Sequence, residues 1–324
     1  MIERMSTFRP VAAGDIPRLQ QAYLGFARTR EWPRFYMAPL WLAAKGEFIW
    51  GEVGGCTCIV KRRSMYGRPV IYLILPPMSP HGDLDAEYAV LQRFYDAGVG
   101  ARLSDEDVGL YGLEDRVERE KGNEEYIYRA GEFMPLGGKR NRRWRHQWNE
   151  LTTRCEIREY DTCMMGAAGA AAAIDEKWKK VRGLGVAHNR KMMKLFATHA
   201  MQTATWGYTL RGEGGPWAAY GMSQAISPGW VVLLVRQHAF SRGVTDAGRA
   251  QHLLDTRHWC GVGGGDMLLN IGASLNVAGL ASAKEKMRPV KVMSICKLTP
   301  TKQLTMSDYY QCKQARGAGF GFGE

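Results

Sequence analysis

The segment GGKRNRRWRHQWNEL, residues 137–151, combines one lysine and four arginines with two tryptophans, and Glu150 is its one acidic residue. Guanidinium and ammonium groups bind phosphate oxygens, and indole rings can stack on nucleic-acid bases. The segment is therefore a candidate for contact with a polyanion. The residues expected to bind nucleic acid are Lys139, Arg140, Asn141, Arg142, Arg143 and Arg145.

The spacing of this segment predicts an amphipathic helix over residues 139–151. At 100° per residue, Trp144, Trp148 and Leu151 lie in one narrow stripe, and the cationic side chains occupy most of the remaining circumference. We expect the stripe to pack inward and the basic face to meet phosphates, because a merely solvated helix usually mixes charges of both signs. A solvated face, and tryptophans that stack on bases, remain the alternatives.

The composition agrees with an anionic partner. The chain of 324 residues has 44 Lys and Arg against 32 Asp and Glu, which gives a net charge of +12. Such a charge attracts nucleic acid, anionic lipid or phosphorylated cofactors, although it can also serve solubility alone. The seven cysteines include no CxxC pair, which is typical of reduced thiols in a cytoplasmic protein. We find no transmembrane segment and no signal peptide.

Several enzyme classes leave no trace in the sequence. It contains no GxGxxG after a first strand, no GxxxxGK[ST], no HExxH and no GxSxG. A nucleotide kinase, a metalloprotease and an ordinary serine hydrolase are therefore excluded as leading hypotheses.

The elements that must position these residues alternate between helix and strand in both halves. The first 130 residues predict a short strand, two helices, three strands, a further helix and two later strands. Their ranges are 8–10, 15–26, 32–46, 48–53, 56–62, 69–75, 83–98, 108–113 and 125–129.

The second half repeats this order without repeating the letters. Two helices precede three strands, and then helix and strand alternate, with Asp175 expected on the solvent side of its helix, four residues before Lys179. The ranges are 164–184, 189–204, 207–212, 216–226, 230–240, 247–260, 266–272, 276–287 and 290–298. We predict an α+β protein with an N-terminal domain over 1–130, a C-terminal domain over 131–310 and a glycine-rich tail over 311–324.

Two motifs resemble those of the C-terminal catalytic domain of phosphatidylglycerol lysyltransferases and their soluble relatives. The first has a Y-x-Y strand, a leucine-glycine turn and Lys-Arg-Asn at a helix start; the second begins with an asparagine after a strand. The matching residues are Tyr126, Tyr128, Leu136, Gly137, Lys139, Arg140 and Asn141, then Asn270, Gly279, Leu280, Lys284 and Pro289. The sequence departs from the second motif at Ser274, Asn276 and Ala281.

This resemblance, over most of residues 125–298, implies a tandem GNAT-like acyltransferase fold in which each domain is a mixed, mostly antiparallel sheet flanked by helices. It implies a transferase of aminoacyl, amino-acid or acyl groups. Because the chain is basic and has no membrane half, we expect a nucleic acid, either tRNA or DNA, as donor or substrate. Because related genes of bacterial viruses would fit such chemistry, we extend the resemblance to a further expectation, namely amino-acid addition to, or acylation of, modified bases in DNA.

Acyl transfer to an amine needs a base and fixed donors for the oxyanion. His238, near the end of the predicted central strand and on the same strand face as Arg236, is the candidate base, with a structural histidine as the alternative. Asn270 could orient substrate, and Ser274 could take part or simply cap a helix. The resemblance makes Lys284 a candidate partner for phosphate or carboxylate.

The segment after the central strand could hold a cofactor. GNAT enzymes that use acetyl-CoA have a Gln/Arg-x-x-Gly-x-Gly/Ala loop there, whose backbone N–H groups bind pyrophosphate. The corresponding residues here are Thr245, Gly248, Arg249 and Ala250. This partial match leaves an acetyl-CoA-dependent N-acetyltransferase as an alternative. A catalytically silent nucleic-acid-binding module is the other, favoured by the departures at Ser274, Asn276 and Ala281.

Overall fold

The structure is a computed structural model that describes residues 7–34, 38–65, 68–133, 136–160, 168–182, 187–203, 205–238, 247–273 and 278–301. The chain divides into two compact units. Unit 1 comprises the described residues of Met1–Tyr36, Gly46–Glu124 and Met293–Glu324, and unit 2 comprises those of Met37–Lys45 and Glu125–Val292. Neither unit is one continuous stretch of chain.

Unit 1 contains one mixed sheet with its helices. Its elements are β1 (Arg9–Pro10), η1 (Ala13–Asp15), α2 (Ile16–Ala27), β2 (Phe48–Val53), β3 (Cys56–Met65), β4 (Arg68–Leu73), α4 (Leu84–Asp96), β5 (Gly100–Ser104), α5 (Asp105–Tyr111), η2 (Glu114–Arg116), β6 (Val117–Arg119) and β14 (Ile295–Leu298). The strand order is β1-β2-β3-β4-β5-β14-β6. All neighbours are antiparallel except β4 and β5, which run parallel.

The helices of unit 1 form where the sequence caps them and supplies an apolar stripe. Asp83 caps α4 by accepting a hydrogen bond from the backbone N of Ala86 at 3.0 Å. Leu91 and Phe94 of α4 then pack into the core of this unit with apolar residues of the strands. The predicted helix over 83–98 is confirmed.

Unit 2 contains the second mixed sheet. Its elements are α3 (Pro39–Lys45), β7 (Glu125–Arg129), η3 (Ala130–Glu132), η4 (Lys139–Asn141), α6 (Arg142–Arg154), β8 (Cys155–Tyr160), α7 (Ala168–Arg182), α8 (Ala187–Thr203), β9 (Thr205–Gly212), β10 (Trp217–Ser227), β11 (Trp230–His238), α9 (Ala247–Gly263), β12 (Leu268–Ala273), α10 (Ala278–Lys286) and β13 (Lys291–Met293). The strand order is β13-β7-β12-β11-β10-β9-β8. β11 and β12 run parallel, whereas β8, β9, β10 and β11 are successive antiparallel neighbours and β7 is antiparallel to β12.

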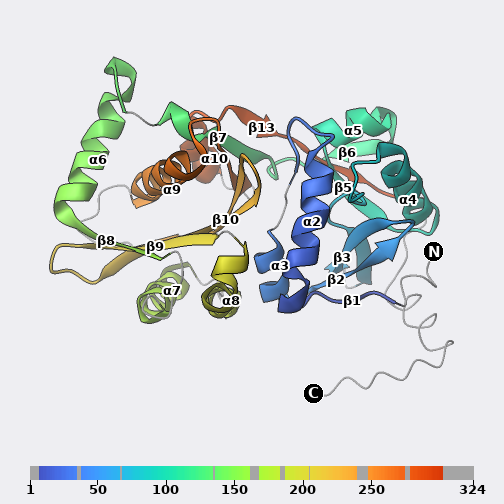
Figure 1. Ribbon diagram of the computed structural model, residues 1–324, viewed down its shortest axis with the longest axis horizontal. Helices are drawn as coiled ribbons and strands as arrows, with labels where there is room; N and C mark the ends of the chain where they lie inside the picture. Colours follow the sequence, from blue (N-terminus) through green and yellow to red (C-terminus); the bar gives the residue numbers. More distant parts are fainter. Residues whose placement is uncertain are drawn as a thin grey trace. The chain divides into compact units, whose positions relative to one another are not determined.

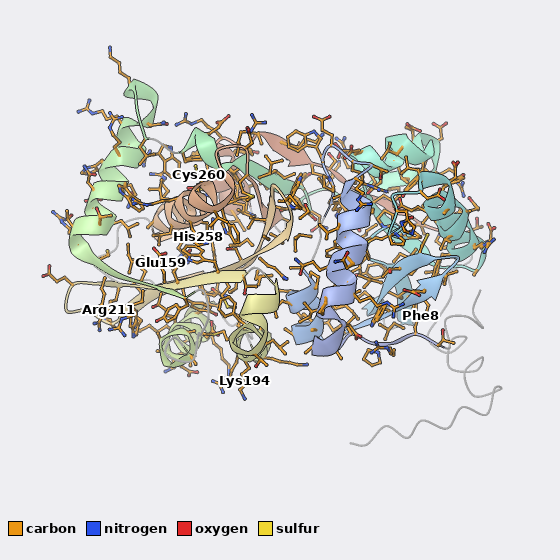
Figure 2. All side chains as sticks on the ribbon, viewed as in Figure 1. Phe8, Glu159, Lys194, Arg211, His258 and Cys260 are labelled. Carbon is orange, nitrogen blue, oxygen red and sulfur yellow. The ribbon has the colours of Figure 1, made fainter. Side chains whose placement is uncertain are left out.

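Helices cover both faces of the sheet of unit 2. Figure 1 shows α7 and α8 on one face and α6 and α9 on the other. Adjacent residues of β10 face these helices alternately, as the two-residue period of a strand requires. The Tyr220 hydroxyl bonds to Asp175 of α7, while Gly221 lies over the ring of Tyr208, whose hydroxyl bonds to the backbone of Gln251 in α9. On the α9 side, His258 (labelled in Figure 2) stacks on Trp206 of β9, with ring centroids 4.1 Å apart.

The two sheets have the same plan, and each takes one strand from the other half of the chain. β7 follows β6 in sequence but lies beside β12 in the second sheet. β14 follows β13 after a single residue but lies between β5 and β6 in the first sheet. The predicted α+β class, with mixed and mostly antiparallel sheets, is confirmed.

Three predicted elements are corrected by the structure. Residues 108–113 are not a strand: α5 starts at Asp105 because the Ser104 hydroxyl and the Asp107 carboxylate form a reciprocal capping box. The final strand over 290–298 is two strands, β13 and β14, in different sheets. The basic helix begins at Arg142, and residues 139–141 form a 3-10 turn before it.

Candidate functional site

The parallel strands of unit 2 separate at their carboxyl ends. β11 pairs with β12 over Trp230–Val232 and Leu268–Asn270. Beyond these residues β11 continues to His238 and β12 to Ala273, and in this described part of the chain the two strands do not pair with each other. We call this region the β11–β12 opening, formed by residues 233–238 and 271–273. In open sheets with parallel strands, ligands bind beyond the carboxyl ends of the strands.

A bulge in β12 lies where its pairing with β11 ends. Gly272 has φ +71°, which favours glycine, and the pairing of β12 with β7 shifts register between Asn270 and Ala273. The Lys284 ammonium of α10 donates to the carbonyl oxygens of Ile271, Gly272 and Ala273 at 2.9, 2.7 and 2.9 Å. Lys284 therefore holds the end of β12 in its bulged conformation.

Lys284 is buried, contrary to the solvated position usual for a lysine in mid-helix. Burial, and then the charge of Arg236, lower the pKa of Lys284 to about 7, while Glu125 acts in the opposite direction. The Lys284 ammonium already donates to three backbone carbonyl oxygens. We therefore interpret Lys284 as a positioning residue rather than as the phosphate or carboxylate partner implied by the resemblance.

Asn270 belongs to the same bulge. Its side-chain amide donates to Glu125 Oε2 at 2.7 Å, and its Oδ1 accepts from the backbone N of Gly272 at 2.8 Å. The residue is 2% exposed. The structure thus brings Asn270 and Lys284 together around Gly272, but both ends of the amide already have protein partners.

Arg236 of β11 lies on the α9 side of the sheet. Its Nε and Nη2 donate to Asp255 Oδ2 at 2.8 and 2.6 Å, and Nη2 lies 3.4 Å from His252 Nδ1. Although burial opposes the charge, the Asp255 carboxylate raises the pKa of Arg236. The charge of Arg236 also acts on Lys284 and Tyr128, so one buried polar region joins α9, β11, α10 and β7.

Sequence reasoning missed His252 and Asp255, which it assigned only to a helix over 247–260. His252 is fully buried, and its ring lies 4.7 and 4.6 Å from the rings of Tyr128 and Phe133. Burial and the charge of Arg236 lower the pKa of His252, so the imidazole is neutral. His252 Nε2 and Asp255 Oδ1 have no hydrogen-bond partner among the described atoms. The sequence signal that could have identified these two residues is a pair of ionisable side chains three residues apart on an apolar helix face.

His238 and Arg236 do not contact the same side of the sheet, contrary to the expectation from their spacing. The His238 ring lies edge-on to Trp178 of α7, with centroids 5.7 Å apart, whereas Arg236 contacts α9. Asp175 of α7 is also not on the solvent side as expected, since its Oδ1 accepts a hydrogen bond from the Tyr220 hydroxyl at 2.7 Å.

The predicted cofactor residues lie at the start of α9. Ala250 is buried in the core, and the guanidinium of Arg249 is 6.0 Å from the ring centre of Trp144. A Cβ at Gly248 would meet no described atom within 4 Å, and the first turn of α9 carries no acidic residue, although Asp246 directly precedes it in the sequence. The unpaired N–H groups at the start of a helix attract an anionic group. Thr245 and Ser274 lie outside the described residues.

The stripe of α6 packs inward as predicted. Trp144 and Leu151 are buried, and Trp148 is half-buried with the Arg257 guanidinium 4.5 Å from its ring centre. The two tryptophans are core residues on the face toward α9. Base stacking is not the role of the Trp144 ring, which packs against Phe133 at 5.1 Å.

The basic face of α6 is only partly available. Lys139, Arg142 and Arg143 are exposed, and each forms no ion pair with a described acidic residue. Arg145 differs from the expectation: its Nη1 donates to the carbonyl oxygens of Leu136 and Gly138 at 2.6 and 2.7 Å. Asn141 precedes α6 without capping it, and of Arg140 only the backbone in η4 is described.

Unit 1 has no comparable opening at its own parallel pair. β4 and β5 pair at Tyr72–Gly100 and Leu73–Ala101. At the next position the fully buried Arg34 donates to the carbonyl oxygens of Ile74 and Arg102, at 2.9 and 3.4 Å. The first turn of α4 is acidic, with Asp85 and Glu87. The Arg34 guanidinium thus occupies the space just beyond the last paired residues of β4 and β5, and the acidic start of α4 repels anions.

Two further observations bear on the type of site. The described residues contain no group of three or more His, Cys, Asp or Glu side chains suited to a metal ion. No described helix has the length and apolar character needed to cross a bilayer.

Solved structures share this fold at low sequence identity. A conserved protein of unknown function from Bacteroides thetaiotaomicron has a TM-score of 0.66 and 14% identity, over 91% of this chain and 99% of its own. L-PGS from Bacillus licheniformis has a TM-score of 0.60 and 15% identity, over 94% and 98%. The C-terminal domain of a putative lysylphosphatidylglycerol synthetase from Agrobacterium fabrum has 0.60 and 12%, over 93% and 96%.

These likenesses span nearly the whole chain, and the predicted tandem GNAT-like fold is confirmed. No protein-family model matches the sequence, and no curated protein is similar to it at a significant level.

Proposed function

We propose that the protein is an acyl- or aminoacyl-transferase whose donor binds in the β11–β12 opening of unit 2, with a nucleic acid as donor or substrate. The observation that carries the proposal is the contrast between the two parallel pairs. One opens beside Arg236 and the bulge held by Lys284, and the other is filled by Arg34. The similarity to L-PGS and to the lysylphosphatidylglycerol synthetase domain supports transferase chemistry.

The residues at the opening suit stabilisation of an oxyanion. Transfer of an acyl group passes through a tetrahedral species whose negative oxygen needs fixed donors in a site shielded from water. Arg236 is such a donor, because Asp255 and His252 fix its guanidinium. We assign His238, at the end of the same strand, as the base that removes the proton of the acceptor.

The nucleic-acid part of the proposal rests on α6. Lys139 of η4 and Arg142 and Arg143 of α6 are exposed cations within five residues of one another, without described acidic partners. Such a cluster binds phosphates through counterion release, and a net charge of +12 attracts the polymer over a longer range.

An acetyl-CoA-dependent N-acetyltransferase is the second candidate. It is favoured by the start of α9, where a Cβ at Gly248 would meet no described atom within 4 Å and the first helical turn contains no acidic residue. Acetyl-CoA would be a substrate that supplies the acyl group, and Gly248 and Arg249 would lie near its phosphates.

Mass spectrometry of tRNA and DNA tests the proposal. The protein is incubated with each nucleic acid and with labelled aminoacyl-tRNA or labelled acetyl-CoA. We expect label in a new product, and we expect Arg236→Gln to reduce the rate by about 100-fold or more, as loss of one oxyanion donor does. Arg236→Lys, which keeps the charge, is expected to recover part of it. If the parent transfers no label from either donor, the protein is a silent binding module.

A further inference from the structure

A half-buried carboxylate lies on the face of the sheet opposite to α9, beside the end of β11. Asp175 Oδ1 accepts from the Tyr220 hydroxyl at 2.7 Å, and Asn189 Nδ2 donates to the same hydroxyl at 3.0 Å. Tyr220 is in register with Gln237, which follows Arg236. These bonds fix the carboxylate at the level of the β11–β12 opening, on the α7 side.

The second oxygen of Asp175 is available. Among the described residues no group donates a hydrogen bond to Oδ2, and the exposed Arg190 of α8 is the described cation whose charge acts on the carboxylate. The next carboxylate in the sequence behaves differently. Glu176 is exposed and pairs with Lys180 at 3.7 Å. Burial raises the pKa of Asp175 above its usual range, although the bonds from Tyr220 and Asn189 oppose the shift.

The rings of Trp178 and His238 lie on the same side of the sheet as the Asp175 carboxylate. Trp178 is one turn further along α7 than Asp175, on the same helix face, and it contacts His238 at the end of β11. The face of an indole attracts cations, and a carboxylate with an open oxygen pairs with an ammonium group. The α7 side therefore offers the contacts that a primary ammonium group requires.

The charged side chains nearest the end of β11 differ between the two sides of the sheet. Arg236 lies on the α9 side, paired with Asp255. Asp175 lies on the α7 side, where its carboxylate attracts a cationic group at short range, while the exposed lysines of the same helix, Lys177, Lys179 and Lys180, oppose attraction over a longer range. A donor on the α9 side and an amine on the α7 side would therefore contact different residues.

We propose that Asp175, Trp178 and His238 form a binding site for a primary ammonium group, which makes the acceptor an amine. This inference rests on the proposed function for the role of the amine, but the binding site itself is defined without any donor. Asp175 determines the specificity, because its charge distinguishes an amine from a neutral compound of the same shape.

Binding of cadaverine to the full-length protein tests the site. Titration calorimetry at neutral pH is carried out on the parent, on Asp175→Asn and on the matched control Glu176→Gln, which removes the same charge from the adjacent exposed position. We expect the parent and Glu176→Gln to bind within about twofold of each other, and Asp175→Asn to bind about tenfold or more weakly. 1-Pentanol, a neutral compound of similar length, is expected not to compete.

A second variant guards against misfolding. Asp175→Asn keeps the Oδ1 that accepts from Tyr220, and its melting temperature checks the fold. If it is unfolded, Trp178→Leu serves instead and is expected to weaken cadaverine binding several-fold. Absence of binding to the parent, equal binding by Asp175→Asn and Glu176→Gln, or competition by 1-pentanol would overturn the proposal. Since no donor is present, failure of acyl transfer does not affect this result.

Discussion

At the scale of single residues, the chemistry of the site depends on how the chain fixes two buried cations. Arg236 is held by the Asp255 carboxylate, and Lys284 is held by the carbonyl oxygens of Ile271, Gly272 and Ala273. A cation is expensive to bury unless acceptors surround it. Under the proposed function, both belong to a preorganised site in which Arg236 would stabilise the oxyanion and Lys284 fixes the end of β12.

The pH dependence of stability tests the burial of Lys284. Its pKa is about 7 in the folded protein, below its usual range near 10.5, so between these values the unfolded chain binds more protons and rising pH favours the folded state. We expect the free energy of unfolding of the parent to increase relative to Lys284→Met between pH 7 and pH 9, by at most about 1.4 kcal/mol per pH unit. Urea unfolding at both pH values measures this difference.

Lys286→Met is the control, because Lys286 is exposed on the same helix. It is expected to differ from the parent by the same amount at both pH values. A constant difference between the parent and Lys284→Met would mean that the buried ammonium stays charged throughout.

At the scale of elements, α6 joins a packed stripe to a basic face, and the structure refines which cations are available. Neutralising Lys139, Arg142 and Arg143 to Gln removes exposed charges and leaves the Arg145 contacts that hold the preceding turn. We expect the dependence of duplex-DNA affinity on salt to flatten by up to about 2.7 in log–log slope if each cation contacts a phosphate. Fluorescence anisotropy across a salt series measures it.

The matched control neutralises Lys177, Lys179 and Lys180, which are exposed on α7 in the same unit. Equal slopes for the two triple variants would show that net charge alone drives binding, and α6 would then be only a solvated face.

Close packing of elements gives a second prediction at this scale. A Cβ at Gly25 of α2 would lie 2.4 Å from the carbonyl oxygen of Ser79, and one at Gly109 of α5 would meet nothing within 4 Å. Gly25→Ala is expected to destabilise by about 1–3 kcal/mol through overpacking. Gly109→Ala is expected to stabilise by about 0.5–1 kcal/mol, because alanine favours a helix interior. Chemical denaturation of both variants checks the opposite signs; equal effects would contradict this packing.

At the scale of the whole molecule, the sequence predicted the class and most of the element order, but not α5, β6, β8 or the exchange of strands. Hydrophobic patterns identified β2, β7 and α4, because the formation of these elements depends on local periodicity. Nothing local distinguishes β14 from β13, since their separation into two sheets is a matter of distant partners. Residues 108–113 were missed because the capping box at Ser104 outweighs the strand propensity of Val108 and Tyr111.

The candidate site was predictable to a similar degree. Asn270 and Lys284 came from the resemblance, and the structure brings them together at one bulge. Their bonds to Glu125 and to backbone carbonyls depend on Gly272, whose positive φ no spacing rule reveals. Arg34, which fills the corresponding point of unit 1, follows a helix as an ordinary loop arginine in the sequence.

The central claim is that transfer takes place at the β11–β12 opening, next to the start of α9. The most direct measurement compares Gly248→Glu with Gly261→Glu in the labelled-donor assay. Both glycines lie on α9 with no described atom within 4 Å of an added Cβ, but of the two only Gly248 is at the end next to the opening. A carboxylate there repels an anionic donor. The account predicts that Gly248→Glu loses transfer by about 100-fold or more while Gly261→Glu keeps the activity of the parent. Equal activity of the two variants would contradict it.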